Sequence, residues 1–499
     1  MSTAIVIGGG ISGLATAALL ARDGHSVTLL EKQDAVGGRA GSWSSGGFRF
    51  DTGPSWYLMP EVFDHFFRLM GTSAQEQLDL VRLDPGYRVL FEHGEPITVT
   101  SDRAENIAMF EAIEPGAGVR LARYLDSASD TYRMAKKRFL YSTFESFAPL
   151  FRADVLTRLP TLARLLLQSL HSRIAGTFRD PRLRQVLGYP AVFLGSSPFQ
   201  TPSMYHLMSH LDLTDGVFYP MGGFAGVIER IAALATDAGA SIRTSAAVRR
   251  IIVEGGSTTG VELEDGTIVS ADLVVSTADL HHTETVLLDR EHQTYPEEYW
   301  RRRVAGPGAL LLYLGVRGEL PQLEHHTLLF ANDWRANFDA IFGKTQTVPD
   351  VPSLYVCTPS RTDPGVAPPG DSNVFVLVPV PADPELNLRD LADRVIAQIA
   401  EWAGIPDLAD RIVVRRTVGP AHFARELNAW KGSSLGPAHV LKQSAFFRGS
   451  NRSRRVRGLY YAGSSTAPGI GLPMCLISAE LVVKRLRGDV STSPLPEPL

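Results

Sequence analysis

The chain has 499 residues, a net charge of -4 and 44% apolar residues, so it is too long for one hydrophobic core and is expected to form two or three domains. The slight negative charge argues against a nucleic-acid partner held by a general basic field. Its two cysteines, Cys357 and Cys475, form no C-x-x-C pair, which argues against a disulfide framework and a thiolate metal site and favours a reducing, intracellular setting.

No segment is expected to span a membrane or to act as a targeting peptide. The apolar residues 4–20 contain glycines and follow no basic segment, whereas a membrane span needs about 20 continuous apolar residues and a signal peptide a basic start. The adjacent pairs His281–His282 and His325–His326 are not expected to bind metal, because neighbouring residues on a strand or helix point apart. No metal site is therefore predicted.

The start of the chain, as far as Glu31, predicts a nucleotide-binding βαβ unit. A short apolar run is expected to form a buried strand, and a helix and a second strand follow it. Gly24 is typical of the residue that ends such a helix. The three elements are expected at residues 4–7, 12–22 and 26–30.

Glycines follow the first strand with the spacing G-x-G-x-x-G. Gly8 permits the tight turn, Gly10 lets the backbone approach a pyrophosphate, and Gly13 allows the helix to pack closely on the strand. The amides at the start of the helix then point at the phosphates. Glu31 closes the second strand, where a carboxylate accepts hydrogen bonds from an adenosine ribose.

The residues after Glu31 separate a flavin nucleotide from a nicotinamide nucleotide. Gly37, Gly38 and Arg39 bring the backbone close and add a permanently charged fork for phosphate oxygens. From Gly8 to Arg39 the chain resembles the FAD-binding opening of the glutathione-reductase-like flavoproteins, which include amine oxidases, protoporphyrinogen oxidase and carotenoid desaturases. The resemblance implies an FAD cofactor and an α/β fold, with a Rossmann domain and an inserted α+β substrate domain.

Residues 51–55 follow a strand-like segment and contain Gly53, Pro54 and Ser55. In the resembled families a loop at this point passes the flavin ring, and a glycine can approach the ring where a side chain cannot. An ordinary Gly-Pro turn explains the same residues. Both interpretations stay open on the sequence alone.

Helix-like apolar periodicity replaces the nucleotide-binding pattern from about residue 61 to residue 219. Residues 161–178 carry no acidic side chain and predict one amphipathic helix, with an apolar stripe of Ala163, Leu166, Leu167, Leu170 and Ile174. Arg164 lies on the polar face of this helix, and further basic residues lie nearby at Arg152, Arg158 and residues 136–138. Such a surface fits either packing on its own domain or contact with anionic lipid.

The middle of the chain predicts a return to the nucleotide-binding domain. Tyr219 and the four residues that follow it introduce a helix over residues 224–238, and a strand-rich stretch continues to about residue 279. Asp265–Gly266 between apolar-alternating runs predicts a hairpin. The order resembles the family's adenine-side strands, which places Val248 where the backbone meets the adenine.

Residues 286–419 predict the remainder of the substrate domain, with strands near residues 309–314 and 373–378. The Ser/Pro-rich residues 491–499 are expected to be disordered. The resulting division is a discontinuous FAD domain, a helical membrane or substrate-access region, a substrate domain that completes the sheet, and a tail. The FAD domain comprises residues 1–60, 220–285 and 420–490. The helical region is 61–219, the substrate domain 286–419 and the tail 491–499.

The chain from Gly458 onward predicts a strand, a loop rich in glycine and proline, and an amphipathic helix over residues 479–486. The loop offers unpaired amides to a flavin near Gly463, Pro473 and Met474. Its T-x-P-G-x-G-x-P segment resembles the phytoene desaturase family of bacterial carotenoid synthesis, and this resemblance covers nearly the whole chain. Many members have histidine where this chain has Ala467 and glycine where it has Met474, which leaves the product open.

The resemblance implies desaturation of a carotenoid precursor, with phytoene as the first choice, by hydride transfer to FAD and loss of a proton. No general base is identified, because the cation left by hydride loss is very acidic. The implied partners are a long apolar isoprenoid, the inner membrane surface as the site of a peripheral cytoplasmic enzyme, and oxygen or a quinone as acceptor. Alternatives are carotene isomerisation, ketolation, a later desaturation, amine oxidation, or prenyl-lipid binding as in Rab GDP-dissociation inhibitors.

Overall fold

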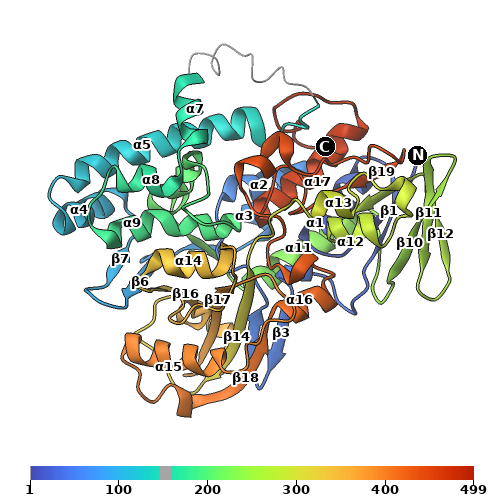
Figure 1. The fold of residues 1–499 in the computed structure, drawn as a ribbon. Coiled ribbons are helices and arrows are strands. Elements are labelled where there is room, and N and C mark those ends of the chain that lie inside the picture. Colours follow the sequence, from blue (N-terminus) through green and yellow to red (C-terminus); the bar gives the residue numbers. More distant parts are fainter. Residues whose placement is uncertain (1, 146–158) are drawn as a thin grey trace.

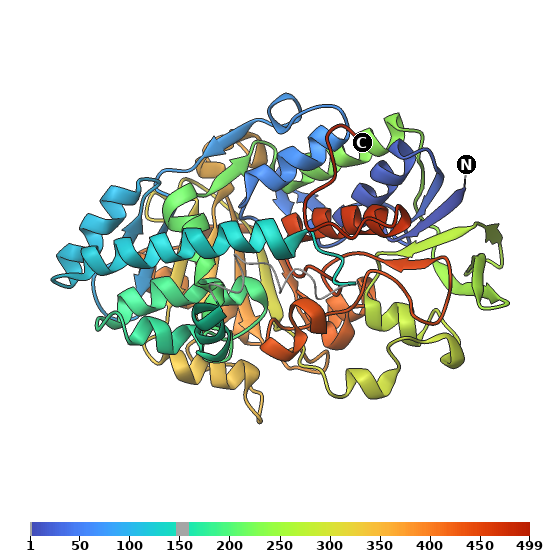
Figure 2. The same ribbon diagram turned by 90° about the horizontal axis from the view of Figure 1, so that it is seen from above.

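The computed structural model describes residues 2–145 and 159–499, and its centre is a five-stranded parallel sheet (Figures 1 and 2). The strand order is β19-β13-β1-β2-β9, so segments from the start, middle and end of the chain pair side by side. The bounds are β1 (Thr3–Ile7), β2 (Ser26–Leu30), β9 (Ser241–Arg243), β13 (Leu273–Ser276) and β19 (Leu459–Tyr461). The α/β fold class and the two predicted N-terminal strands are confirmed.

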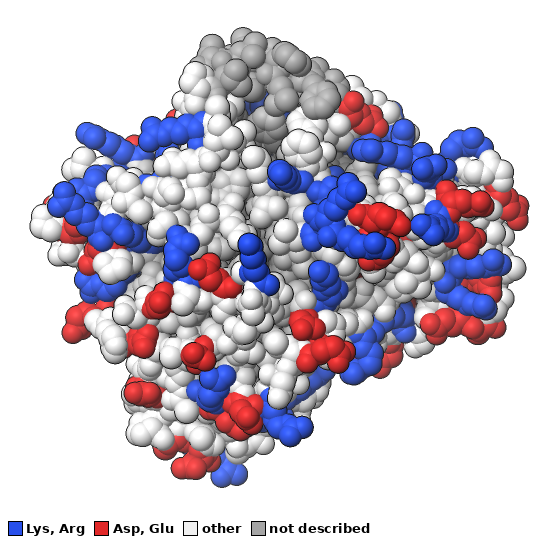
Figure 3. Space-filling model, viewed as in Figure 1, with Lys and Arg blue, Asp and Glu red and all other residues white. Residues whose placement is uncertain are grey.

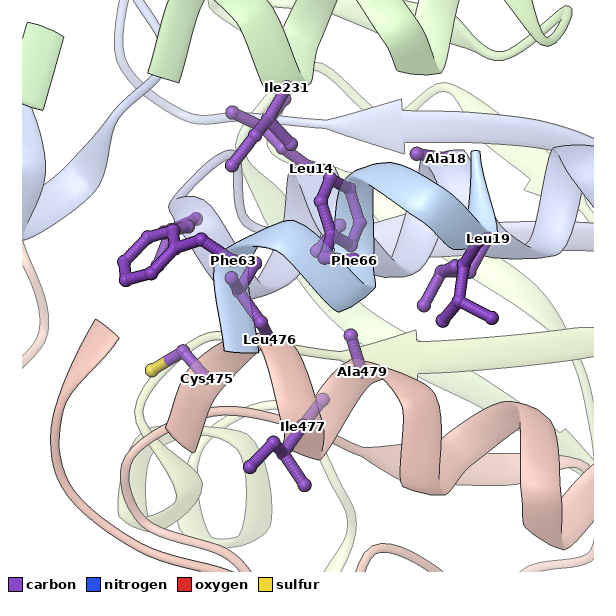
Figure 4. Close-up of a cluster of buried hydrophobic side chains, with 14 of the residues drawn as sticks. Leu14, Ala18, Leu19, Phe63, Phe66, Ile231, Cys475, Leu476, Ile477 and Ala479 are labelled. Atoms are coloured by element: carbon purple, nitrogen blue, oxygen red, sulfur yellow. The ribbon is translucent and has the colours of Figure 1, made fainter. Parts of the chain in front are cut away.

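Three helices pack around this sheet, and α1 lies between the other two. They are α1 (Ile11–Arg22), α11 (Gly223–Asp237) and α17 (Leu472–Leu486). Small side chains on α1 let the neighbouring helices approach closely, and Ala15, Ala17 and Ala18 are fully buried. Figure 4 shows part of this packing, in which α2 (Pro60–Leu69) places Phe63 and Phe66 against α17. This packing fixes the loops at the carboxyl ends of the strands.

The C-terminal helix differs from its prediction. It begins at Leu472, well before the expected start at residue 479, because Pro473 occupies the first helical turn, where its fixed φ is favourable. It is also not amphipathic: residues 475–484 are buried continuously under α1 and α2. The predicted helix over residues 224–238 is confirmed as α11 to within one residue.

A three-stranded antiparallel sheet flanks the parallel one and contains β10 (Val248–Glu254), β11 (Ser257–Leu263) and β12 (Ile268–Ser270). The predicted hairpin turn at Asp265–Gly266 lies between β11 and β12, with Gly266 at a φ of 84°. This sheet occupies the right edge of Figure 1.

A second large sheet has the order β18-β14-β17-β16-β15-β6-β7. One face packs on α15 (Leu391–Ala403), and the other faces the helical region and α14 (Trp334–Phe342). The strands are β6 (Tyr87–Phe91), β7 (Ile97–Val99), β14 (Gly308–Val316), β15 (His326–Phe330), β16 (Leu354–Cys357), β17 (Ser372–Val380) and β18 (Ile412–Val418). The strands predicted near residues 309–314 and 373–378 are confirmed as β14 and β17.

The prediction that residues 61–219 are helical is wrong for the segment that contains β6 and β7. Their side chains alternate between the two faces, and β6 pairs in parallel with β15, a strand from the distant second half of the chain. That pairing adds the segment to the edge of the second sheet. Apart from the short strands β5 (Leu80–Arg82) and β8 (Phe218–Pro220), the other described elements of the region are helices. They include α4 (Arg103–Ile113), α5 (Ala117–Ala135), α7 (Leu159–Leu167), α8 (Leu170–Ala175) and α9 (Pro181–Gly188).

The single helix predicted over residues 161–178 is two helices, α7 and α8. The chain breaks at Ser169, whose hydroxyl accepts from the Ser172 amide and caps α8, while the Leu170 amide donates to the Thr201 carbonyl instead of continuing α7. The apolar stripe is consequently divided: Leu170 is buried, whereas Leu167 is 81% exposed. Arg152 and Arg158 lie outside the described residues.

Short elements connect these layers, and none of the described helices is both long and apolar enough to cross a bilayer. The remaining elements are α3 (Ala74–Gln77), α10 (Met208–His210), α12 (Leu280–Thr285), α13 (Glu297–Trp300), α16 (Pro420–Glu426), β3 (Ser42–Ser45), β4 (Phe48–Asp51), β5 (Leu80–Arg82) and β8 (Phe218–Pro220).

The predicted disorder of residues 491–499 is also wrong. Leu495 is buried and its amide donates to Glu480 Oε1 at 2.6 Å, and the Leu499 amide donates to the Leu69 carbonyl at 3.0 Å. The tail packs because α17 presents a buried cation to it: Lys484 Nζ donates to the carbonyls of Ser491 and Ser493 at 2.8 and 2.6 Å. Composition alone does not reveal this partner.

Removal of residues 491–499 is expected to lower the free energy of unfolding by about 1–3 kcal/mol, because the fully buried Lys484 ammonium loses its acceptors on Ser491 and Ser493. Thermal unfolding of the truncated chain measures this loss. Lys484→Met in the truncated chain is expected to restore part of it, since the buried ammonium that has lost acceptors is then gone. An unfolding temperature unaffected by truncation would contradict the assignment of the tail as a structural element.

Candidate active site

A cavity of about 1270 Å³ runs from the carboxyl ends of β1 and β2 into the space between the second sheet and the helical region. It is larger than the roughly 300–1,000 Å³ of a typical small-molecule pocket, so it has room for more than one ligand. All predicted site residues except Gly13 line it. The structure thus brings together Gly8, Gly10, Glu31, Gly38, Arg39, Gly53, Pro54, Ser55, Val248, Gly463, Pro473 and Met474.

The glycine loop leaves open space on its cavity side. A Cβ on Gly13 would lie 1.9 Å from the Gly8 carbonyl oxygen, so Gly13 supports the loop from beneath by close packing. A Cβ on Gly10 would meet nothing closer than the Gly37 carbonyl at 4.0 Å, and Gly10 borders the cavity. A phosphate can therefore approach the backbone at Gly10 and the amides of the first turn of α1.

Glu31 borders the cavity at the end of β2 and is held by backbone amides. Its Oε2 accepts from the Gly9 amide at 2.5 Å and its Oε1 from the Gln33 amide at 2.8 Å. Each carboxylate oxygen has further lone pairs, so these contacts orient Glu31 and leave it able to accept from a ribose hydroxyl. Val248, at the start of β10, lines the same part of the cavity together with Ala246 and Ala247.

Arg39 is the strongest sign of an anionic ligand. Its guanidinium Nε and Nη2 are buried and have no hydrogen-bond partner among the described residues. Unpaired buried donors are costly, whereas a phosphate offers an arginine the oxygens that it lacks here. The backbone around Arg39 is held closely, since a Cβ on Gly53 would lie 2.4 Å from the Arg39 carbonyl oxygen.

The loop before α17 closes the other side of the cavity. Gly463 and Gly471 both have a φ of 115°, a left-handed conformation that favours glycine. Pro473 and Met474 begin α17 and face the cavity, where the positive end of the helix dipole favours electron-rich groups. This loop and Arg39 therefore line the same cavity and would both offer donors to an anionic ligand there.

Two buried side chains that the sequence analysis did not identify hold this loop in place. Asn451 Nδ2 donates to the carbonyls of Tyr461 and Ala467 at 3.2 and 3.1 Å. Arg448 donates to the carbonyls of Thr466 and Pro437, and burial lowers its pKa to about 10. Both residues act on the backbone from outside the glycine-rich segment, so no local pattern marks them.

A polar chain that the sequence analysis also missed begins at Ser55. Ser55 Oγ and Tyr355 Oη are 2.7 Å apart, and Tyr355 Oη lies 2.7 Å from His326 Nδ1. Burial raises the pKa of Tyr355 far above its usual value, and burial and the neighbouring His325 lower the pKa of His326. The pairing of β15 with β16 brings Tyr355 and His326 together, and Ser55 reaches them from the loop after β4.

The prediction that adjacent histidines point apart is wrong for His325 and His326, whose ring centroids are 4.6 Å apart. His325 precedes β15, so its side chain does not follow the alternation of the strand. Cys357 lies beside them. Burial raises the pKa of the Cys357 thiol to about 12, which disfavours the thiolate that metal binding requires. We therefore interpret the group as a hydrogen-bonded cluster, and the absence of a metal site stays a prediction.

The rest of the cavity is an apolar arm. Aromatic and aliphatic side chains of α14, the second sheet and the helical region line this arm. The acidic side chains of the cavity lining lie instead near the predicted nucleotide site, at Glu31, Glu264, Asp279 and Glu426. The apolar arm includes Trp56, Phe139, Leu162, Leu166, Phe193, Leu328, Phe330, Trp334, Phe338, Phe342 and Phe446. A long hydrocarbon fits this lining, whereas a cationic amine finds no carboxylate in it within residues 2–145 and 159–499.

The arrangement as a whole fits FAD. The Arg39 donors, the open backbone at Gly10 and the start of α17 together match an extended dinucleotide whose redox ring lies at the loop of Gly53 to Ser55. A hydride acceptor at that loop would face the apolar arm.

Comparison with known proteins agrees with this assignment. The sequence matches the family described as "Flavin containing amine oxidoreductase" over residues 11–487. It is 42% identical to a carotenoid 3,4-desaturase of Haloarcula japonica, over 97% of this chain and 98% of that protein. It is 36% identical to a zeta-carotene-forming phytoene desaturase of Myxococcus xanthus, over 97% of this chain and 93% of that one.

The fold is similar to that of a solved oxidoreductase from Methanosarcina mazei. The TM-score is 0.63 at 18% sequence identity, and the match covers 97% of this chain and 100% of the other.

Arg39→Ala is expected to weaken FAD binding about 10- to 100-fold, because a hydrogen bond to a charged group contributes about 1.5–3 kcal/mol and a tenfold change corresponds to about 1.4 kcal/mol. Titration of the cofactor-free protein with FAD, followed by flavin fluorescence, measures the change. The thermal unfolding of the cofactor-free protein is expected to stay the same or rise, since two unpaired buried donors are removed. Undiminished affinity would show that Arg39 does not contact the cofactor.

Proposed function

The chain belongs to the flavin-containing amine oxidoreductase family and is an FAD-dependent oxidoreductase, and from this premise we propose that it desaturates a carotenoid precursor. Phytoene is the first choice of substrate, and more conjugated carotenes such as lycopene are the products. The observation that carries the proposal is the apolar arm, which is continuous with the flavin site and has no acidic side chain among the described residues of its lining. The names of the curated relatives support the same class of substrate.

The size and lining of the apolar arm suit a long hydrocarbon. Burying a C40 chain stabilises it by roughly 30 kcal/mol relative to water, at about 0.8 kcal/mol per carbon. Aromatic rings around Trp56 supply flat surfaces for a polyene: Phe193 and Tyr189 lie 5.3 and 6.1 Å from the Trp56 ring. Both of these residues also line the cavity.

FAD, when bound, accepts a hydride from an allylic carbon of the substrate. The protein supplies position and surroundings. Arg39 and the start of α17 would hold the cofactor, and the loop of Gly53 to Ser55 would set the distance between its ring and the hydrocarbon. The apolar walls would exclude water, which protects the carbocation from capture. The electrons would then pass to oxygen or a quinone.

Carotene isomerisation, ketolation and a later desaturation are alternatives on the same scaffold, and the apolar arm suits all three. Amine oxidation is disfavoured because the part of the chain that the structure describes places no acidic residue in the lining of that arm. A prenyl-lipid-binding protein without flavin is disfavoured by the buried, unpartnered donors of Arg39.

We further propose that the enzyme reaches its substrate from a membrane surface, as a peripheral protein at the inner face of the cell membrane. Leu162 and Leu166 of α7 line the cavity, and Leu167 on the same helix is 81% exposed. Phe447, another lining residue, is 61% exposed, and Arg164 on α7 is also exposed. In Figure 3, basic side chains flank a largely uncharged strip below α7, as lipid contact requires.

Expression of the chain in cells that accumulate phytoene is expected to give coloured carotenes, and purified protein is expected to show flavin absorbance. Chromatography of the pigments identifies the product. Colourless cells that contain soluble, FAD-loaded protein would refute phytoene as substrate. Protein that stays free of flavin even after FAD is added would refute the enzyme assignment itself.

Replacement of Leu167 and Phe447 together by serine is expected to reduce binding to anionic liposomes at least about 10-fold, since burying each side chain stabilises by up to about 1.5–3 kcal/mol. Sedimentation with vesicles measures the bound fraction. Ile268→Ser is the matched control, because Ile268 is 62% exposed on β12 in the separate three-stranded sheet. Equal binding of all three proteins would show that the lipid contact is elsewhere.

A further inference from the structure

Ser55, Tyr355 and His326 form a hydrogen-bonded chain that leads from the cavity wall into the protein interior. Ser55 and Tyr355 line the cavity, and their hydroxyl oxygens are 2.7 Å apart. Tyr355 Oη is in turn 2.7 Å from Nδ1 of His326, which is fully buried behind them. We call these three residues the Ser-Tyr-His chain.

The surroundings fix the geometry of this chain. His326 on β15 pairs with Cys357 on β16, and Leu328 pairs with Tyr355 two residues along, so Tyr355 and His326 project from the same face of the sheet. The Trp56 ring stacks on the His326 imidazole, with centroids 4.5 Å apart and an angle of 12° between the planes. Because Trp56 follows Ser55 directly, the stacking also sets the position of the serine.

The imidazole at the end of the chain can receive a proton. His326 Nε2 has no hydrogen-bond partner among the described residues, and none of their carboxylates engages the ring. Burial and the adjacent His325 keep His326 neutral at rest by lowering its pKa. With the proton on Nε2, the Nδ1 lone pair accepts from the tyrosine. The Cys357 thiol beside Tyr355 is a neutral donor, since burial raises its pKa to about 12.

We infer that the Ser-Tyr-His chain is the proton relay of the proposed desaturation; the inference rests on that proposed function. As the hydride and its two electrons leave one carbon for FAD, the neighbouring C–H bond breaks and its electron pair becomes the new double bond. The released proton passes to Ser55 Oγ, the Ser55 proton to Tyr355 Oη, and the Tyr355 proton to His326 Nδ1. The substrate is oxidised by two electrons, and His326 carries one added proton.

A weak base is sufficient for this step. The carbocation is a far stronger acid than an imidazolium, so transfer to His326 is favourable even with its lowered pKa. The same low pKa makes His326 release the proton afterwards. The proton returns along the chain when the oxygen or quinone acceptor takes up two electrons, since its reduction consumes protons. The relay is thus restored after each turnover.

Deuterium exchange distinguishes a proton relay from hydrogen bonds that only hold the Ser55 loop against the second sheet. Wild-type holoenzyme with its flavin chemically reduced is incubated without oxygen in D2O, together with the carotene that it forms from phytoene. The Ser55, Tyr355 and His326 protons exchange with D2O before the carotene binds, so the relay is expected to deliver a deuteron to the carotene as the reduced flavin returns the hydride. Mass spectrometry measures the deuterium in the less conjugated carotene that forms. Hydrogen bonds with only a structural role would transfer no proton to the substrate.

Tyr355→Phe and His326→Gln are expected to lower this exchange by about 100-fold, the lower end of what a general base contributes. Both variants are expected to keep their flavin absorbance. Two control variants outside the cavity lining are expected to exchange as the wild type does: Tyr124→Phe, a buried tyrosine, and His292→Gln.

Two results would overturn the relay: no exchange in a wild-type enzyme that converts phytoene, or undiminished exchange in both FAD-loaded variants. Failure of the wild type to act on any carotene, with FAD bound, would instead overturn the proposed function and the relay with it. The conversion assay on the wild type therefore separates the two failures.

Discussion

Direct contact between backbone segments at glycine is the constraint on which the nucleotide-binding half depends. α1 can lie against the loop that precedes it only because Gly13 has no Cβ to meet the Gly8 carbonyl, 1.9 Å from where that atom would be. The same α1 carries the alanines that admit α11 and α17. Any side chain larger than hydrogen at Gly13 would move the helix and with it the start of α17. One close contact thus positions both walls of the cofactor site.

The elements with local signals were predictable from the sequence. The strand, glycine loop and helix of the first unit depend on short-range spacing between Thr3 and Glu31, and the hairpin at Asp265–Gly266 depends on two turn residues. The break at Ser169 was not predictable, because the competing acceptor, the Thr201 carbonyl, belongs to a segment beyond the next two helices of the chain. Similarly distant partners determine the edge strands β6 and β7 and the ordered conformation of residues 491–499.

The residues of the candidate site also differ in whether a local sequence signal predicts them. Residues that touch a cofactor through the backbone have recognisable types and spacings, since glycine and proline have restricted uses. The side chains that complete the site carry no such mark: Ser55, His326 and Tyr355 come from a loop and two strands that meet only in the folded sheet. Buried polar groups are fixed by their partners, and a single sequence does not state which residues become neighbours.

The order of strands in the parallel sheet has a consequence for biosynthesis. β1, made first, lies beside β13, and β13 is completed by β19, which begins only at Leu459. The loop and helix that close the cofactor site follow still later. While the ribosome is translating, the nascent chain therefore lacks one wall of the site, and FAD can be enclosed only after α17 has been synthesised. Chaperones that act on the emerging chain would consequently meet a cofactor-free Rossmann domain with an open sheet edge.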